Sequence, residues 1–354
     1  MNTTSNCYQK CYRVAILIAA CCISGCAATA IQVPRMKPAE VNLGPVKRVA
    51  VMAIQGAGGE DVSDQLTQAI LATGRYEVVD RQHLAQIVGE QEIGAQDETI
   101  AAKVGKVLGA AALIFGRVSN NKYDEGITFS TGTCRENKQD LPCTTYVRTG
   151  THKVALSLKV VSSADAKYLA SRSLQASKQA STKLTVLGPN TIDRRKLAEI
   201  HASIPSIDNV DDLKTQAIGD TVAVFMKAIA PYQVMVRVIL YDEGKLPPTS
   251  QGVVAAKRGD WTMAVTSFQQ AVALANDNKD MDDQTRARAI YNLGVALGYG
   301  GDYAHGIAEI NRAYEVYAEE TFLNEVTSLK QFMADDAKLK KQAEDAATVA
   351  PATN

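Results

Sequence analysis

In the first two thirds of the chain, segments with the apolar pattern of strands alternate with segments that have the apolar spacing of helices. Short runs rich in β-branched residues lie at 46–54, 76–79 and 111–118. Residues 154–160 alternate apolar and polar side chains, which is the period of a half-buried strand and implies antiparallel pairing. Helical spacing between the runs predicts helices at 62–70, from Asp80, from Asp97 and at 218–229. Strands that alternate with helices predict an α/β domain with a mixed sheet, and residues 234–240 are expected to be its last strand.

A second apolar pattern begins near residue 251 and repeats once. The matching positions are Gly252 and Gly294, 259–261 and 301–303, and Phe268 and Ile310. The two copies resemble tetratricopeptide (TPR) repeats, which implies an all-α repeat module. The paired glycines predict close approach of two helices, with Phe268 and Ile310 filling the space behind them. Two repeats are fewer than such modules usually need, so we expect a capping helix from Phe322 to Met333. The tail after Asp335 is expected to continue as helix and then fray.

The N-terminus has the pattern of a secretory signal. Lys10 and Arg13 precede an apolar run from Val14 to Ile23, which is too short to span a bilayer. The run ends in Ser24-Gly25-Cys26, which resembles the bacterial lipobox. This resemblance implies that Cys26 becomes the N-terminus and carries acyl chains such as palmitate. The alternative is an ordinary signal cleaved after Ala28 or Ala30.

Cysteine usage agrees with export. The signal would remove Cys7, Cys11, Cys21 and Cys22, and lipidation would use Cys26. Cys134 and Cys143 then remain, and an exported chain meets an oxidising compartment. We therefore expect a Cys134–Cys143 disulfide. A metal site is the alternative, but His152 is the only nearby histidine.

Composition narrows the range of functions. Apolar residues make up 46% and charged residues 21% of the chain, as in soluble globular proteins. Lys plus Arg and Asp plus Glu both number 38, so no basic excess favours nucleic acid as a partner. The glycines at 56–59 lack the remainder of a dinucleotide or P-loop motif. We expect no enzymatic activity, no metal and no cofactor.

Three segments of the α/β domain carry a more specific resemblance. Their sequences are Lys-Arg-Val-Ala-Val at 47–51, Arg-Tyr-Glu-Val-Val-Asp-Arg at 75–81, and the run from Gly105 to Val118. In order and spacing they resemble the core of the curli production assembly/transport (CsgG) lipoproteins. The resemblance implies a periplasmic α/β sandwich of the anticodon-binding type on an outer-membrane anchor. Gly109 and Gly116 would be turn or close-packing residues, so this motif indicates a fold and not an active site.

The curli channel assembles from many subunits, each contributing two membrane-spanning β-hairpins. The corresponding stretches here, 120–151 and 177–209, hold many charged residues and show no lipid-facing apolar band. We therefore expect a non-channel member: an outer-membrane-anchored periplasmic lipoprotein that assists secretion or envelope assembly. The alternative is a subunit of an oligomeric, CsgG-type secretion channel, and a homo-oligomer is compatible with both.

We expect the repeat module to be the part of the chain that binds a partner. TPR modules hold peptides in a groove lined by the first helix of each hairpin. The residues expected there are Lys257, Arg286, Asn292 and Tyr299. Their cationic, amide and aromatic groups suit the backbone and acidic side chains of an extended protein or peptide partner. The alternative is that this face is solvated or packs on the α/β domain.

The predicted organisation has six parts. They are a lipoprotein signal peptide (1–25), a lipidated tether (26–45), a CsgG-like α/β domain (46–241), a linker (242–250), a TPR-like domain with its capping helix (251–333) and a charged, partly disordered tail (334–354).

Overall fold

The computed structural model describes residues 27–79, 111–163, 165–188 and 194–348. The signal segment, Cys26 and the helices expected from Asp80 and Asp97 lie outside the described residues. The chain divides into two compact units. We call residues 38–232 with 340–348 the α/β unit, and residues 27–37 with 233–339 the helical unit. Within the described ranges the chain forms eight helices and a five-stranded mixed sheet.

The sheet of the α/β unit has the order β3-β2-β4-β5-β6. Its strands are β2 (Arg48–Gln55), β3 (Glu77–Val79), β4 (Ala111–Glu136), β5 (Gln139–Ser162) and β6 (Tyr168–Leu187). β2 pairs in parallel with β3 and β4, whereas β4, β5 and β6 are antiparallel. Residues 154–160 lie in β5, and Leu156, Leu158 and Val160 on one side of the strand are buried. The half-buried antiparallel strand predicted from period two is therefore confirmed.

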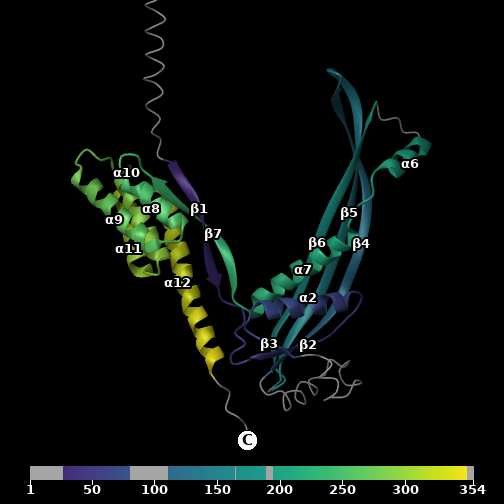
Figure 1. Ribbon diagram of the computed structural model, residues 1–354, viewed down its shortest axis with the longest axis horizontal. Helices are drawn as coiled ribbons and strands as arrows, with labels where there is room; N and C mark the ends of the chain where they lie inside the picture. The colour runs from purple at the N-terminus through teal and green to yellow at the C-terminus, as the bar shows by residue number, and fades with distance from the viewer. Residues whose placement is uncertain (1–26, 80–110, 164, 189–193, 349–354) are drawn as a thin grey trace, which may run out of the picture. The chain divides into compact units, whose positions relative to one another are not determined.

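Two helices pack on one another and on the sheet (Figure 1). They are α2 (Gly59–Ala72) and α7 (Val210–Ile229), and α7 includes the predicted helix at 218–229. Leu66 and Ile70 of α2 lie in the same buried cluster as Ile218 and Phe225 of α7 and Leu158 of β5. The helical spacing in the sequence predicted that these apolar faces are buried.

The glycines between β2 and α2 are required by close packing. Gly56 has a φ of 96°, and a Cβ there would collide with the backbone carbonyl of Val118. A Cβ on Gly59 would collide with the carbonyl of Ile54. Only glycine can follow this path, so the turn at 56–59 is explained without a bound phosphate.

β4 and β5 continue past the helices as one long hairpin (Figure 1). The ladder is paired from Ala112–Ser162 to Glu136–Gln139. Asn137 and Lys138 form the turn, with φ values of 49° and 67°, as a two-residue hairpin turn of the primed type requires. The segment between Cys134 and Cys143 is therefore the regular tip of a hairpin. The charged side chains at 135–140 did not prevent strand pairing, because at the tip they remain exposed.

The helical unit contains two strands and five helices. They are β1 (Ala27–Lys37), β7 (Tyr232–Asp242), α8 (Pro248–Lys257), α9 (Trp261–Asp277), α10 (Asp283–Tyr299), α11 (Tyr303–Val316) and α12 (Glu320–Ala347). β7 begins one residue before the unit, and α12 from residue 340 is part of the α/β unit. Helix α8 packs on α9, α9 on α10, and α10 on α11.

The repeated glycines have the packing role predicted from the sequence. A Cβ on Gly252 would overlap the ring of Phe268, and one on Gly294 would lie 2.6 Å from Cγ1 of Ile310. Asp260, in the repeated turn, caps α9 by accepting a hydrogen bond from the Met263 N–H at 2.9 Å. The close approach of both helix pairs is therefore confirmed.

Two expectations about the strands were wrong. Residues 27–37, expected to be part of a tether, form strand β1, and Ile31 and Val33 are buried in it. The strand at 234–240 does not join the five-stranded sheet, because β7 pairs with β1 in a separate two-stranded sheet. The apolar positions of β1 and of β7 were visible in the sequence. The two strands that pair are, however, about 200 residues apart in the chain.

Candidate functional site

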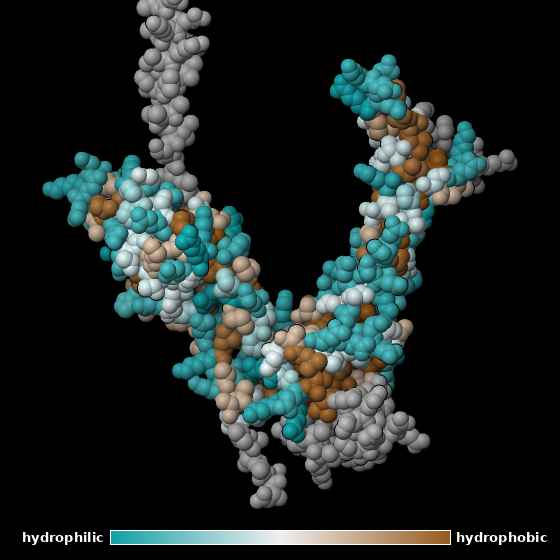
Figure 2. All heavy atoms as spheres, viewed as in Figure 1, coloured by the Kyte–Doolittle hydropathy of each residue, from teal (hydrophilic) through white to brown (hydrophobic). Residues whose placement is uncertain are grey.

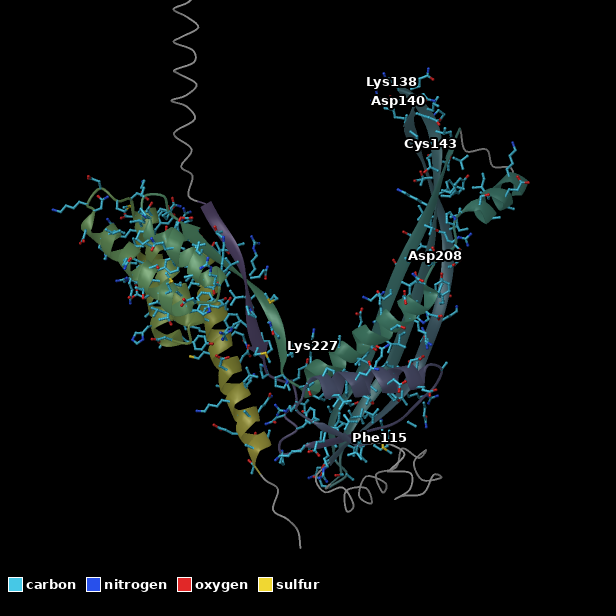
Figure 3. The ribbon with its side chains drawn as sticks, in the orientation of Figure 1. Phe115, Lys138, Asp140, Cys143, Asp208 and Lys227 are labelled. Carbon is cyan, nitrogen blue, oxygen red and sulfur yellow. A yellow bond between two sulfur atoms is a disulfide. The ribbon has the colours of Figure 1, made fainter. Side chains whose placement is uncertain are left out.

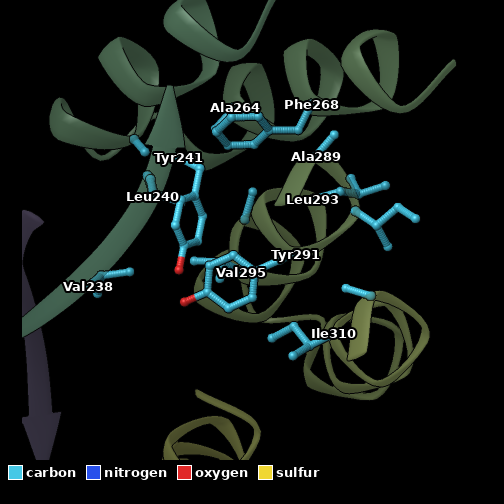
Figure 4. Close-up of a cluster of buried hydrophobic side chains, with 14 of the residues drawn as sticks. Val238, Leu240, Tyr241, Ala264, Phe268, Ala289, Tyr291, Leu293, Val295 and Ile310 are labelled. Carbon is cyan, nitrogen blue, oxygen red and sulfur yellow. The ribbon is translucent and has the colours of Figure 1, made fainter. Parts of the chain in front are cut away.

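Strand β7 lies beside the helices of the helical unit (Figure 4). Asn292 of α10 holds it there by two hydrogen bonds. The Asn292 Oδ1 atom accepts a hydrogen bond from the Tyr241 N–H at 2.9 Å, and its Nδ2 donates to the Tyr241 carbonyl at 2.7 Å. The Tyr241 ring packs edge-on against Tyr291, with centroids 5.5 Å apart. One amide side chain thus satisfies both backbone groups of a residue in an extended strand. β7 therefore covers Asn292, one of the four residues expected to line a peptide groove.

A buried ion pair fixes the end of β7. The Arg288 guanidinium lies 3.4 Å from a carboxylate oxygen of Glu243 and 3.4 Å from one of Glu319. It also lies 4.5 Å from the centre of the Tyr241 ring. Burial opposes the charge on Arg288, but the carboxylates of Glu319 and Glu243 outweigh burial and raise the pKa of Arg288. Burial, together with the hydrogen bond to Glu319, raises the pKa of Tyr241 to about 12. This cluster holds β7 on the helices.

Glu325 of α12 is buried among aromatic residues. Only 8% of its surface is exposed. Burial raises the pKa of Glu325 to about 7, and its contact with Tyr299 offsets only part of that shift. Trp261 stacks on Tyr299, with the two ring centroids 5.2 Å apart. The carboxyl group of Glu325 therefore titrates near neutral pH inside the helical core.

The four residues expected in a groove are not brought together on one surface. Lys257 is exposed at the end of α8. Arg286 is held by Asp283 at 2.8 Å and by the carbonyl of Met281 at 3.1 Å. Asn292 is fully buried under β7, and Tyr299 is 4% exposed. Asn292 and Tyr299 are therefore core residues and not partner contacts. They were misassigned because both are polar and lie on the first helix of a hairpin, and the strand that covers this helix is not adjacent in sequence.

An exposed apolar groove lies instead between α8 and α9. It encloses about 300 Å³ and its lining includes Val254, Met263 and Arg258. The side chains of Val254 and Met263 are 46% and 55% exposed. The sequence signal for this groove was a valine on the side of α8 opposite to its buried glycine, Gly252. The lining combines these apolar side chains with the cation of Arg258 and the carboxylate of Asp260.

The hairpin tip carries the predicted disulfide. Cys134 and Cys143 are bonded, with their Cα atoms 5.7 Å apart. Figure 3 shows Lys138, Asp140 and Cys143 together at this tip. In Figure 2 the tip is hydrophilic, with hydrophobic surface below it along the strands. Phe129 contributes to the apolar surface of this hairpin and is 57% exposed.

A polar cluster ties the hairpin to helix α6 (Arg194–Ser203). Arg148 donates to Glu125 at 3.0 Å and to the carbonyl of His201 at 2.9 Å. Glu125 also accepts from the Tyr123 hydroxyl at 2.7 Å, and these two donors lower the pKa of Glu125. His152 is buried on β5 and pairs with Asn121 at 2.6 Å, and burial lowers its pKa. In the described ranges no three His, Cys, Asp or Glu side chains group as metal ligands would.

The structure thus defines a two-part protein: a mixed α/β domain with a disulfide-closed hairpin, and a helical unit bound by its own strands. No helix among the described residues combines the length and apolar character needed to cross a membrane. The sequence model of the curli production assembly/transport component CsgG family matches residues 46–230. Because this is more than half of the chain, the protein belongs to the CsgG family.

Solved structures resemble the chain only distantly. Lipoprotein GNA1162 from Neisseria meningitidis is 15% identical with a TM-score of 0.23, and the match covers 44% of this chain and 94% of that one. A minor lipoprotein from Acinetobacter baumannii is 11% identical with a TM-score of 0.22, covering 51% and 90%. The hypothetical protein CT253 from Chlamydia trachomatis is 11% identical with a TM-score of 0.22, and the match covers 51% of this chain and 95% of that one. At these scores the likeness carries no conclusion about function. No curated protein matches the chain.

Proposed function

We propose that this protein is a non-enzymatic periplasmic lipoprotein, anchored in the outer membrane at Cys26, that assists secretion or envelope assembly by binding a protein or peptide partner. The carrying observation is the joining of a CsgG-family domain, residues 46–230, to a helical unit with an exposed apolar groove. The sequence contains no recognisable nucleophile or cofactor motif, which favours binding over catalysis.

The helical unit supports a TPR-like role through its repeated packing. Gly252 with Phe268, and Gly294 with Ile310, make equivalent contacts in two successive helix pairs. Stacked helix pairs of this kind are binding scaffolds in many proteins. Here the strand β7 covers α10, as the bonds from Asn292 to Tyr241 show. The groove between α8 and α9 is a surface of the unit that β7 leaves open, and it is the binding surface we propose.

The chemistry of this groove suits one class of partner. Val254 and Met263 offer exposed apolar surface, and methionine adapts its shape to different side chains. Arg258 in the lining supplies a cation that can pair with a carboxylate. The partner segment we propose has an apolar side chain that enters the groove and an acidic residue beside it.

Crosslinking in intact envelopes tests the partner surface. Val254→Asp places a charge in the groove and should abolish capture of the partner. Val224→Asp is the matched control, because Val224 of α7 is an equally exposed valine at 51% and lies outside the groove. Both variants should keep the wild-type thermal stability, since exposed substitutions change it by only about 0.5 kcal/mol. Capture that survives Val254→Asp would reject the groove as the binding surface.

Mass spectrometry of the mature N-terminus tests the anchor. We expect an N-terminal peptide that starts at Cys26 and carries acyl chains, because two or more chains are needed for stable anchoring. An unmodified peptide beginning at Ala27 or later would contradict the anchor and would favour ordinary signal cleavage.

A subunit of an oligomeric secretion channel is the second candidate. The long strands β4 and β6 favour it, since β6 is an edge of the sheet and β4 beyond residue 117 has β5 as its only partner among the described strands. Such long edges can pair with another copy. Detergent-extracted protein should then form rings in electron microscopy. A monodisperse monomer across micromolar concentrations would count against this candidate.

A further inference from the structure

Strand β1 leaves almost no free chain after the proposed anchor. It begins at Ala27, the residue bonded to Cys26. Ile31 and Val33 are each 5% exposed and belong to the buried cluster of the helical unit. At the other end of the strand, Arg35 pairs with Asp336 at 3.2 Å and Lys37 with Asp335 at 2.6 Å. β1 is therefore an integral part of the helical unit.

We propose that the lipid anchor holds the helical unit directly on the membrane surface in one fixed orientation. The inference rests on the proposed lipidation of Cys26. Consecutive Cα atoms are about 3.8 Å apart, so the folded strand starts one residue from the acylated cysteine. A flexible tether over residues 26–45 would instead allow a typical excursion of about 25 Å. In the structure, residues 27–37 are instead a strand that packs in the helical unit.

The direction of β1 determines which end of the helical unit faces the bilayer. β1 and β7 run in opposite directions (Figures 1 and 4), so Ala27 lies at the end where β7 finishes at Asp242. The residues that follow β7 are joined to the α9–α10 connection by the Lys245–Asp282 ion pair at 2.8 Å. We call residues 243–247 and 278–282 the anchor end.

The opposite end of the unit lies beside the last residues of β1. The Arg35 guanidinium is 5.9 Å from the centre of the Tyr299 ring, and Tyr299 stacks on Trp261. We call the turns 258–260 and 300–302 the distal end. Helix α9 connects the two ends over 17 residues, so they are separated by about 25 Å.

The surface chemistry of the anchor end suits lipid headgroups. Lys279 and Asp280 are exposed there, whereas its two large apolar residues, Leu246 and Met281, are 1% and 7% exposed. An end with mixed charge and inward-facing apolar side chains can rest on a zwitterionic and anionic headgroup layer. Within residues 243–247 and 278–282 no large apolar side chain is exposed for insertion into the acyl region. The anchor supplies the affinity, and β1 supplies the orientation.

Labelled cysteines in the full lipidated protein test the orientation. Lys279→Cys at the anchor end and Arg258→Cys at the distal end form a matched pair, because both replace exposed cations next to turns between helices. Each variant is labelled with the same fluorophore. It is then reconstituted in phosphatidylethanolamine–phosphatidylglycerol vesicles that contain a headgroup-attached quencher. The label at 279 should lose most of its fluorescence, and the label at 258 should keep nearly all of it.

A flexible insertion provides the control. Twenty Gly/Ser residues between Cys26 and Ala27 allow an excursion of about 25 Å and should remove the difference between the two labels. Equal quenching at 279 and 258 without the insertion, in protein whose acylation is verified by mass spectrometry, would overturn the inference while leaving the anchor in place. Absence of acylation would overturn the proposed anchor itself. A second anchor-end label at Asp280→Cys guards against a local effect at 279.

Discussion

The buried carboxyl of Glu325 makes the stability of the helical unit depend on pH. Burial raises its pKa from 4.5 to about 7 in the folded state. Between these values the folded state binds more protons than the unfolded state, so stability falls as pH rises. The stabilisation is fully present below about pH 4.5 and is lost as pH passes through about 7. A difference of about 2.5 pKa units corresponds to at most ~3 kcal/mol.

Replacing Glu325 with Gln removes this dependence. The amide has nearly the same shape and remains neutral, so Glu325→Gln should be more stable than the wild type at pH 8, by ~1–3 kcal/mol, and similar to it at pH 5. Urea unfolding monitored by tryptophan fluorescence measures the effect. Trp261 is the only tryptophan in the chain and stacks on Tyr299 in the same core, so its emission reports this unit.

The matched control is Glu320→Gln in the same helix. Glu320 is exposed, so its replacement should leave the pH dependence of the wild type unchanged. The reasoning is refuted if Glu325→Gln keeps the wild-type slope between pH 5 and 8, or if both variants change it equally. Either result would mean that the carboxyl of Glu325 is solvated or paired in the folded state.

Three further variants probe the same structure. Asn292→Ala leaves the buried N–H and carbonyl of Tyr241 without partners and should destabilise the helical unit by ~2–4 kcal/mol in urea unfolding, an effect that exposed Asn292 would not produce. Gly294→Ala forces a Cβ against Ile310 and should cost ~1–3 kcal/mol in the same assay, whereas a wild-type midpoint would disprove the close helix approach. Replacing both Cys134 and Cys143 with Ser removes a cross-link between residues nine positions apart and should lower the stability of the α/β unit by ~2–3 kcal/mol. Free thiols in non-reducing peptide maps of the native protein would contradict that bond.

Local patterns in the sequence were sufficient for several elements. The alternation at 154–160 predicted a half-buried antiparallel strand, and the spacing at 218–229 predicted a helix in α7. The glycines at 252 and 294 predicted tight helix pairs, because a residue without a Cβ is needed where two backbones meet. The pairing of Cys134 with Cys143 followed from counting the cysteines that remain after export. In each case the information lies within a few tens of residues.

Only the tertiary structure decided which distant segments meet. The apolar residues of β1 and β7 suggested strands or a tether, but their pairing joins segments about 200 residues apart, and period two does not specify a partner. That pairing buries Asn292 beneath Tyr241, so an amide that appeared suited to a ligand serves the protein's own backbone. The groove at Val254 and Met263 could be located only from the packing of α8 on α9, which leaves these two apolar side chains exposed. Sequence determined the hydrophobic faces, because periodicity is local; the fold decided which of them remained exposed, because burial depends on contacts across the whole chain.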